Sequence, residues 1–157
     1  MKKIFAYLGG MVFTVAILSS ISLPQKRTSA PGNQKPDSVN IYLRWVTNHN
    51  VKKLLMTDSH GESAYNNLIT TIRAGGNIKW ILDKESGIIS IDSVWTKETP
   101  SKAFARGNGR NSRGDEFGIQ IRPEARGKYK YSIEFTVSGE AQKTIDPYIR
   151  VNPPDDK

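Results

Sequence analysis

The side chains that come closest to a metal-binding or catalytic set lie in the segment Asp58-Ser59-His60-Gly61-Glu62. In an extended backbone, residues two apart point to the same face, which would place Asp58, His60 and Glu62 together. Two carboxylates and one imidazole are ligands that suit Zn²⁺ or Mn²⁺. Asp, Ser and Gly are also typical of turns. The segment is therefore either a weak candidate for a metal site or a polar connection between two strands.

A second candidate site is the arginine- and glycine-rich segment of residues 106–114. Arg106, Arg110 and Arg113 supply planar guanidinium groups, which bind carboxylate, sulfate or phosphate through paired hydrogen bonds. The glycines have no side chain to bury, so we do not expect this segment to join the core. We expect any contact with an anionic partner to run through these three arginines. The alternative is a solvated loop that only connects two strands.

The composition excludes several classes of enzyme. The chain of 157 residues has no cysteine and only two histidines, His49 and His60. Disulfide bonds, thiolate metal ligands and cysteine nucleophiles are thereby excluded, as is any mechanism that needs several imidazoles. We therefore expect a protein that is not an enzyme and needs no cofactor.

The positive charge of the chain lies partly in its N-terminal segment. The chain has 23 Lys and Arg residues against 15 Asp and Glu residues, a net charge of +8. Four of the cations and none of the acids precede residue 31, so the rest of the chain carries 19 cations against 15 acids. Such a small excess is ordinary for a soluble domain and is not the footprint of a nucleic-acid-binding protein. The sequence predicts no nucleic-acid partner.

The N-terminal residues predict export. Two lysines are followed by an apolar run over residues 4–18, and Ser20 and Ser22 then precede a candidate cleavage site before Leu23. These features predict a signal peptide over residues 1–22. An uncleaved membrane anchor is the alternative, because residues 4–23 are just long enough to cross a bilayer as a helix. Either leader places the protein in the periplasm, in the cell envelope or outside the cell, with membrane contact only through an uncleaved leader.

The rest of the chain divides into three parts. Residues 23–38 contain three prolines and a glycine and little apolar surface, so we expect a disordered tether. Residues 39–152 carry nearly all of the remaining apolar side chains and are expected to form one folded domain. Residues 153–157 are expected to form a polar tail, because this proline-rich end cannot continue a sheet.

Apolar residues recur with a period of two through much of residues 39–152. The longest example is residues 128–137, in which the odd-numbered positions are all apolar or aromatic. Trp80 keeps phase with its apolar neighbours and is expected in the core, and Ile89 and Ile91 are expected on one buried face. Residues 51–56 fit either a short helix or a strand. Pro147 is expected to confine the last strand to a sheet edge.

These patterns predict an all-β fold, a single antiparallel β-sandwich that follows the hydrophobic leader. Short, half-buried strands joined by Gly, Asn and Pro turns are typical of such domains. The strands fit a cupredoxin-like and an immunoglobulin-like sandwich nearly equally well, so both topologies remain open at this point.

Two parts of the chain resemble the framework of the cupredoxin-like (plastocyanin-like) β-sandwich family. Residues 72–80 resemble its strand, glycine turn and aromatic-ended strand, and residues 127–133 with residues 149–151 resemble its G-x-Y-x-Y-x-C strand and final I-x-V strand. Ile133 stands where the family has its copper-binding cysteine, and no histidine follows His60. Because blue copper requires two histidines and a cysteine, the resemblance implies a copper-free relative.

The function that these observations favour is a non-enzymatic binding or accessory module of the cell envelope. Its partner would be an envelope protein or an anionic glycan. One alternative is a small metal-dependent hydrolase that uses Asp58, His60 and Glu62. Another is a structural subunit of an envelope assembly that pairs through an exposed strand edge.

Overall fold

The computed structural model describes residues 37–98, 101–105 and 109–152, and the predicted leader, most of the tether and the tail lie outside these ranges. The described residues form strands and turns but no helix, so no helix able to span a membrane lies among them. The predicted all-β class is confirmed. The strands are β1 (Ser38–Asn48), β2 (Val51–Asp58), β3 (Ser63–Tyr65), β4 (Ile69–Arg73), β5 (Asn77–Leu82), β6 (Ile88–Trp95), β7 (Gly109–Arg110), β8 (Glu116–Gln120), β9 (Gly127–Lys130), β10 (Ser132–Val137), β11 (Lys143–Ile145) and β12 (Tyr148–Asn152).

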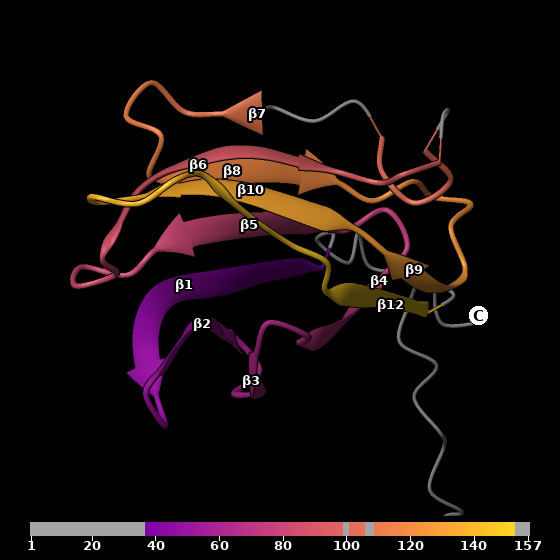
Figure 1. Ribbon diagram of the computed structural model, residues 1–157. Helices are drawn as coiled ribbons and strands as arrows, with labels where there is room; N and C mark the ends of the chain where they lie inside the picture. The colour runs from indigo at the N-terminus through magenta and orange to yellow at the C-terminus, as the bar shows by residue number, and fades with distance from the viewer. Residues whose placement is uncertain (1–36, 99–100, 106–108, 153–157) are drawn as a thin grey trace, which may run out of the picture. The chain divides into compact units, whose positions relative to one another are not determined.

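The described strands form three sheets (Figure 1). One has the order β3-β2-β1-β5-β8-β7, and two sheets of three strands have the orders β11-β10-β6 and β4-β12-β9. The prediction of a purely antiparallel arrangement is wrong, because β1 pairs with β5 and β4 pairs with β12 in parallel. Parallel neighbours need a long connection that returns the chain to the same end of the sheet. The alternation of side chains within a strand carries no information about the direction of its neighbours.

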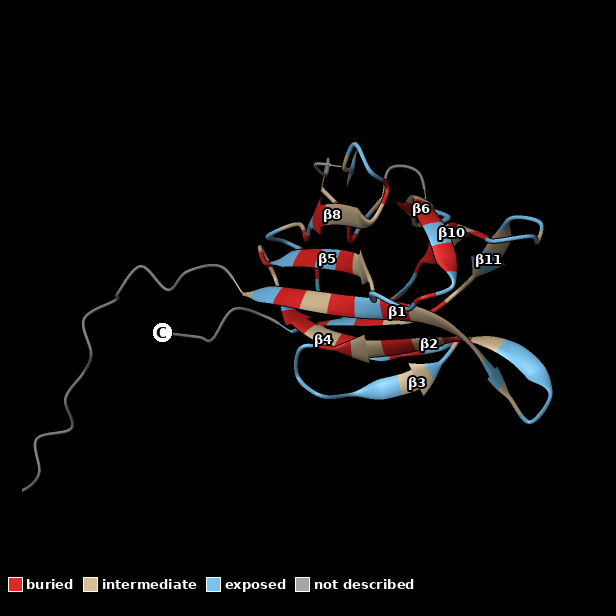
Figure 2. Ribbon diagram, turned by 90° about the vertical axis from the view of Figure 1, so that its left-hand side faces the viewer, coloured by how far each residue is buried: buried red, intermediate tan, exposed pale blue. Residues whose placement is uncertain are grey.

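The core collects the inward-facing positions of the strands (Figure 2). In β1, Val39, Ile41 and Leu43 are fully buried and alternate with more exposed residues. The segment that fits either a helix or a strand forms strand β2, with Leu54 and Met56 buried. Burial of each large apolar side chain stabilises the fold by about 1.5–3 kcal/mol relative to exposure. The core therefore fixes which face of each strand points inward.

Trp80 lies at the centre of a buried aromatic cluster, as its phase predicts. Its Nε1 donates a hydrogen bond to the Tyr131 hydroxyl at 3.2 Å, and the two ring centroids are 5.4 Å apart. Phe104 and Phe117 contact the Trp80 ring edge-on, at 6.2 and 6.4 Å between centroids. Burial raises the pKa of the Tyr131 hydroxyl well above its usual value, so this group stays protonated.

The predicted strand over residues 128–137 is divided at Tyr131. β9 ends before this residue and pairs with β12, whereas β10 begins after it and pairs with β6 and β11. The backbone N–H of Tyr131 donates to the Pro147 carbonyl at 3.1 Å. A period of two detects extended backbone, but it does not detect a change from one sheet to another.

β6 contains two bulges that alter which of its side chains are buried. Its pairing with β10 passes over Ile89 and Asp92. Each extra residue has no direct partner and shifts the following side chains to the other face. Ile89, predicted to share a buried face with Ile91, is therefore 59% exposed, whereas Ser90 is buried.

β12 lies in the middle of its sheet, between β4 and β9, and not at an edge as Pro147 suggested. Pro147 falls between β11 and β12, so its missing N–H interrupts no hydrogen bond between strands. The preceding Asp146 accepts a hydrogen bond from the Ser132 hydroxyl at 2.7 Å. The proline thus marks the passage of the chain from one sheet to another.

Gly76 lies in the turn between β4 and β5, where neighbouring backbone leaves no room for a side chain. A Cβ at this position would lie 2.8 Å from the Asp37 carbonyl oxygen and 2.9 Å from that of Arg73. The same Asp37 carbonyl accepts a hydrogen bond from Asn77 N–H at 2.8 Å. The turn therefore holds the start of β1 beside β5.

We predict that Gly76→Ala destabilises the protein by about 1–3 kcal/mol, because the added methyl group must push backbone atoms apart. Gly118→Ala is the matched control, since a Cβ on Gly118 in β8 meets no atom within 4 Å. Urea unfolding measures both changes. Equal stability of the two variants would contradict the tight packing around the turn.

Glu140 connects the hairpin of β1 and β2 to the turn between β10 and β11. Its carboxylate pairs with Lys52 and with Lys143 (3.2 Å), and it accepts a hydrogen bond from Trp45 Nε1 at 3.3 Å. The hydrogen bond from Lys52, with smaller contributions from Lys143 and Trp45, lowers the pKa of Glu140 to about 2. This carboxylate thus links strands from two different sheets.

We predict that Glu140→Gln lowers stability at neutral pH and that the difference disappears in acid. A carboxylate whose pKa is lowered on folding stabilises the folded state above its ordinary pKa of 4.5, and the contribution is lost as the pH falls through about 2. Thermal unfolding of both proteins from neutral pH down to about pH 2 checks this window. A difference that stays constant over this range would show that the charge of Glu140 is not what stabilises the fold.

Candidate functional site

Asp58 ends β2 and organises the turn that follows. Its Oδ1 accepts hydrogen bonds from the backbone N–H groups of His60 (2.9 Å) and Glu62 (3.1 Å). Gly61 completes the turn with a φ of 91°. Asp58 is 3% exposed, whereas His60 and Glu62 are exposed. Asp58 therefore acts as a turn residue, which is the second of the two readings of this segment.

The three side chains proposed as metal ligands are not brought together. The backbone turns after Asp58, so the shared face of an extended segment is lost. Within residues 37–98, 101–105 and 109–152, no three His, Asp or Glu side chains are placed to hold a metal ion. Oδ2 of Asp58 is buried with no hydrogen-bond partner among the described residues. This geometry offers no support for hydrolysis by Asp58, His60 and Glu62.

The arginine-rich segment is only partly available to a partner. Arg106 lies outside the described residues. Arg110 lies in β7, with its guanidinium 3.8 Å from Oδ1 of Asp92, and a Cβ on Gly114 would lie 2.5 Å from that guanidinium. Arg113 is exposed in the turn between β7 and β8. Arg110 is thus engaged within the protein, while Arg113 faces solvent.

A different group of cations comes together on the sheet of β4, β12 and β9. Outward positions of these strands carry four cations together with one aromatic, one aliphatic and one hydroxyl side chain, and none of the three strands contains an acidic residue. We call this surface the cationic face: Arg73, Lys128, Lys130, Arg150, Tyr148, Ile69 and Thr71.

Strand pairing sets the arrangement of the cationic face. Arg150 of β12 lies between Lys128 of β9 and Thr71 of β4. Tyr148 lies in the next outward row, beside Lys130. Neighbouring strands are about 4.8 Å apart, and successive outward residues on one strand are about 7 Å apart. The cations therefore form a compact grid and not a single line.

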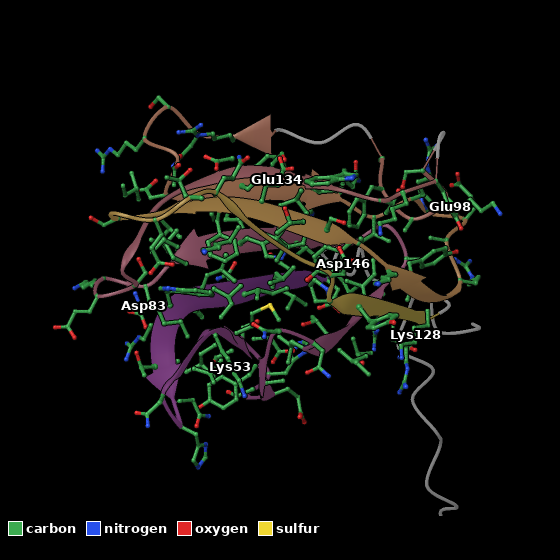
Figure 3. The ribbon with its side chains drawn as sticks, in the orientation of Figure 1. Lys53, Asp83, Glu98, Lys128, Glu134 and Asp146 are labelled. Atoms are coloured by element: carbon green, nitrogen blue, oxygen red, sulfur yellow. The ribbon has the colours of Figure 1, made fainter. Side chains whose placement is uncertain are left out.

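The charges on the cationic face differ in their surroundings. The ammonium of Lys128 lies 4.1 Å from the centre of the Tyr148 ring, a cation–π contact. Figure 3 shows Lys128 near the start of β9, beside the end of β12. Among the described residues, neither Lys128 nor Arg150 forms an ion pair with a carboxylate. Within the described part of the chain, these two adjacent positive charges are therefore not offset by a negative charge.

Asp146 marks the border of the cationic face. Its Oδ2 lies 3.1 Å from the ammonium of Lys130 and 3.5 Å from that of Lys97. Hydrogen bonds from Ser132 and then from Lys130 are the main causes that lower the pKa of Asp146. This carboxylate therefore stays charged at neutral pH and offsets the positive charge at one end of the face (Figure 3).

Cations on the outer face of the six-stranded sheet are matched more closely by acids. Arg44 pairs with Asp83, and Lys79 lies 3.5 Å from Glu116. Exposed pairs of this kind contribute little to stability, but they cancel the local charge. Lys53 of β2 is the exception on this sheet, since it lies 5.9 Å from the centre of the Tyr65 ring and has no ion pair among the described residues.

The cationic face could not be predicted from the sequence, because its members come from three distant segments. Alternation marks Lys128 and Lys130 as outward, and it does the same for Arg150. Only the pairing of β12 with both β9 and β4 brings these residues together. The available signal was the absence of acidic residues in all three strands.

A groove of 590 Å³ lies between β6 and the β7–β8 end of the six-stranded sheet. Trp95 of β6 and Phe117 of β8 line it, together with Phe104 and Ile119. Arg122 contributes a positive charge. Trp95 is partly exposed here and does not belong to the buried core. This groove was not predicted from the sequence.

Comparison with known proteins leaves the family open. The chain matches no protein-family model, and no curated protein matches it. Among solved structures, it is similar to the solution structure of Amebosin, with 20% sequence identity over 55% of this chain and 90% of that chain and a TM-score of 0.29. A score of this size does not establish a shared fold, so the function has to be argued from the site alone.

We predict that Asp58→Ala destabilises the protein by about 1–2 kcal/mol, because two N–H groups in the turn lose their acceptor. His60→Ala should change stability by less than about 0.5 kcal/mol, since its side chain is exposed. Asp58→Asn keeps an acceptor oxygen and should retain most of the stability. Urea unfolding with and without Zn²⁺ or Mn²⁺ tests this reading. If Zn²⁺ or Mn²⁺ stabilises the protein and His60→Ala abolishes that stabilisation, the segment does bind a metal ion and the turn reading is wrong.

Proposed function

We propose that this chain is an exported, non-enzymatic binding module of the cell envelope and that its cationic face binds an anionic glycan. The observation that carries the proposal is the adjacent pair Lys128 and Arg150, exposed on β9 and β12 in a sheet of three strands that contain no acid. Export is proposed from the basic start and the apolar run of residues 4–18. The turn geometry of Asp58 favours binding over hydrolysis.

We further propose that the all-β domain is a copper-free sandwich of the cupredoxin-like type. Gly76 and Trp80 occupy the tight turn and the buried aromatic position on which the resemblance rests. Ile133, at the position of the copper ligand, is fully buried and lies opposite Val94 and Ile145 in its sheet. These aliphatic surroundings suit packing and offer no ligand for copper. An immunoglobulin-like sandwich is the alternative topology.

The chemistry of the cationic face suits an acidic polysaccharide. The guanidinium of Arg150 offers a planar pair of donors, and the ammonium of Lys128 offers a point charge beside it. The Thr71 hydroxyl, in the same row, is able to exchange hydrogen bonds with a sugar hydroxyl. Because outward rows repeat at about 7 Å along the strands, successive acidic groups of a polymer can contact successive rows.

We predict that replacing both Lys128 and Arg150 by Ser weakens binding of the full chain to immobilised dextran sulfate by about tenfold, since exposed charge pairs contribute up to about 1 kcal/mol each. The dependence of affinity on salt should become less steep, because fewer charges are screened. Stability should stay within about 0.5 kcal/mol, as both side chains are exposed. Surface plasmon resonance at several salt concentrations measures the binding.

The matched control is the double change Arg110→Ser and Arg113→Ser, which removes the same charge from the arginine-rich segment. We expect a smaller loss, because Arg110 is already paired with Asp92. A larger loss than for the cationic face would assign binding to the arginine-rich segment. If the unaltered protein binds dextran sulfate no better than neutral dextran, the proposed function is wrong.

A further inference from the structure

The groove lies beside the C-terminal half of β6, along Val94 and Trp95. Earlier in this strand, Ile91 N–H donates to the Gly114 carbonyl at 2.8 Å, and Asp92 lies 3.8 Å from the Arg110 guanidinium. Asp92 occupies the second bulge of β6. Bulges bend a strand and increase its twist. The groove follows this bulge along the chain.

The walls of the groove are mainly apolar. Val94 and Trp95 of β6 face Phe117 and Ile119 of β8 across it, and Phe104 also lines it. Trp95 and Phe117 are only partly buried, so a ligand that covered them would remove apolar surface from water. A volume of 590 Å³ falls within the range of about 300–1,000 Å³ that is usual for small-molecule sites. The groove therefore suits a compact apolar body.

Arg122 places a positively charged group at the edge of this apolar surface. Its Nε donates to the backbone carbonyls of Ser101 (2.8 Å) and Phe104 (3.1 Å). These bonds fix the guanidinium before any ligand arrives, which lowers the entropy lost on binding. Arg122 and Ser101 also line a neighbouring hollow, so both residues lie at the border between this hollow and the groove. The side chain is 36% exposed and remains open to a ligand.

Two acids lie close to Arg122. Glu98 lines the groove as well, but it is paired with Lys102 at 4.0 Å and its side chain is 54% exposed. Figure 3 shows Glu98 at the outer edge of the molecule. Glu124 lies 3.5 Å from Arg122, with a side chain 67% exposed, and is not among the residues that line the groove. Because Glu98 already has a partner, Arg122 is the charge among the described lining residues that is left to attract the head group of a ligand, and it suits an anion.

We propose that this groove binds an amphiphile with an apolar body and a single anionic head, of which a fatty acid is the simplest example. The body lies between Trp95 and Phe117, and the head accepts hydrogen bonds from Arg122. The positive charge of Arg122 is the reason for proposing an anionic head group. The aromatic side chains that line the groove are the reason for proposing an apolar body. The site is separate from the cationic face and does not depend on the proposed function.

The test varies the head group on one apolar body. Decanoate, decanol and decyltrimethylammonium, each below its micelle concentration, are titrated into the full chain by calorimetry. Decanoate should bind about tenfold more tightly than decanol, because hydrogen bonds to a charged donor are about twice as strong as neutral ones. Decyltrimethylammonium should bind most weakly. If decanol or the cation binds as tightly as decanoate, or if none of the three binds, the proposal is overturned.

Variants locate the site. Arg122→Gln should weaken decanoate binding by about tenfold and leave decanol binding unchanged, which also shows that the groove is intact. Trp95→Ala should weaken the binding of both ligands. Arg126→Gln is the matched control, because Arg126 also donates to backbone carbonyls but does not line the groove. Unchanged decanoate affinity in Arg122→Gln would refute the assignment.

Discussion

The hydrogen bond from Trp80 to the Tyr131 hydroxyl joins the middle of the six-stranded sheet to the residue at which the chain passes from β9 to β10. Both residues are almost completely buried. Loss of either partner would leave a buried polar group unpaired, at a cost of about 1–3 kcal/mol. The edge-on contacts of Phe104 and Phe117 with Trp80 restrict the ring to one orientation. The two small sheets are thus positioned against β5 through one aromatic cluster.

The aromatic cluster contacts the elements that form both candidate surfaces, the groove beside β6 and the cationic face. Phe104 and Phe117 contact Trp80 and also line the groove beside β6, so the groove rests on the rigid core and not on a loop of its own. On the other side, the end of β9 at Tyr131 leaves Lys128 and Lys130 on the sheet of β12.

Local periodicity was sufficient to predict most of the longer strands and the inward phase of Trp80, because alternation is a property of each strand alone. It was not sufficient for features that depend on partners distant in sequence. The bulge that exposes Ile89 is defined only against β10, and the central place of β12 behind Pro147 depends on β4 and β9. For Asp58, residue type favoured a turn residue and left a metal ligand as a weak alternative. Only the hydrogen bonds to the backbone N–H groups after it decide in favour of the turn.

The same topology separates the charges of the protein by sheet. On the sheet of β11, β10 and β6, Glu134 accepts a hydrogen bond from Ser93 at 2.7 Å, and Asp92 accepts bonds from Ser90 and Gln142. Burial alone would raise the pKa of Asp92, but these hydrogen bonds lower it. The acids of that sheet are thus satisfied within the protein, whereas Lys128 and Arg150 of the cationic face have no carboxylate partner among the described residues. A partner can therefore pair with either charge without displacing an ion pair that the structure describes. The small excess of cations from residue 31 onward, 19 against 15 acids, therefore does not show how far cations are concentrated on one face of the domain.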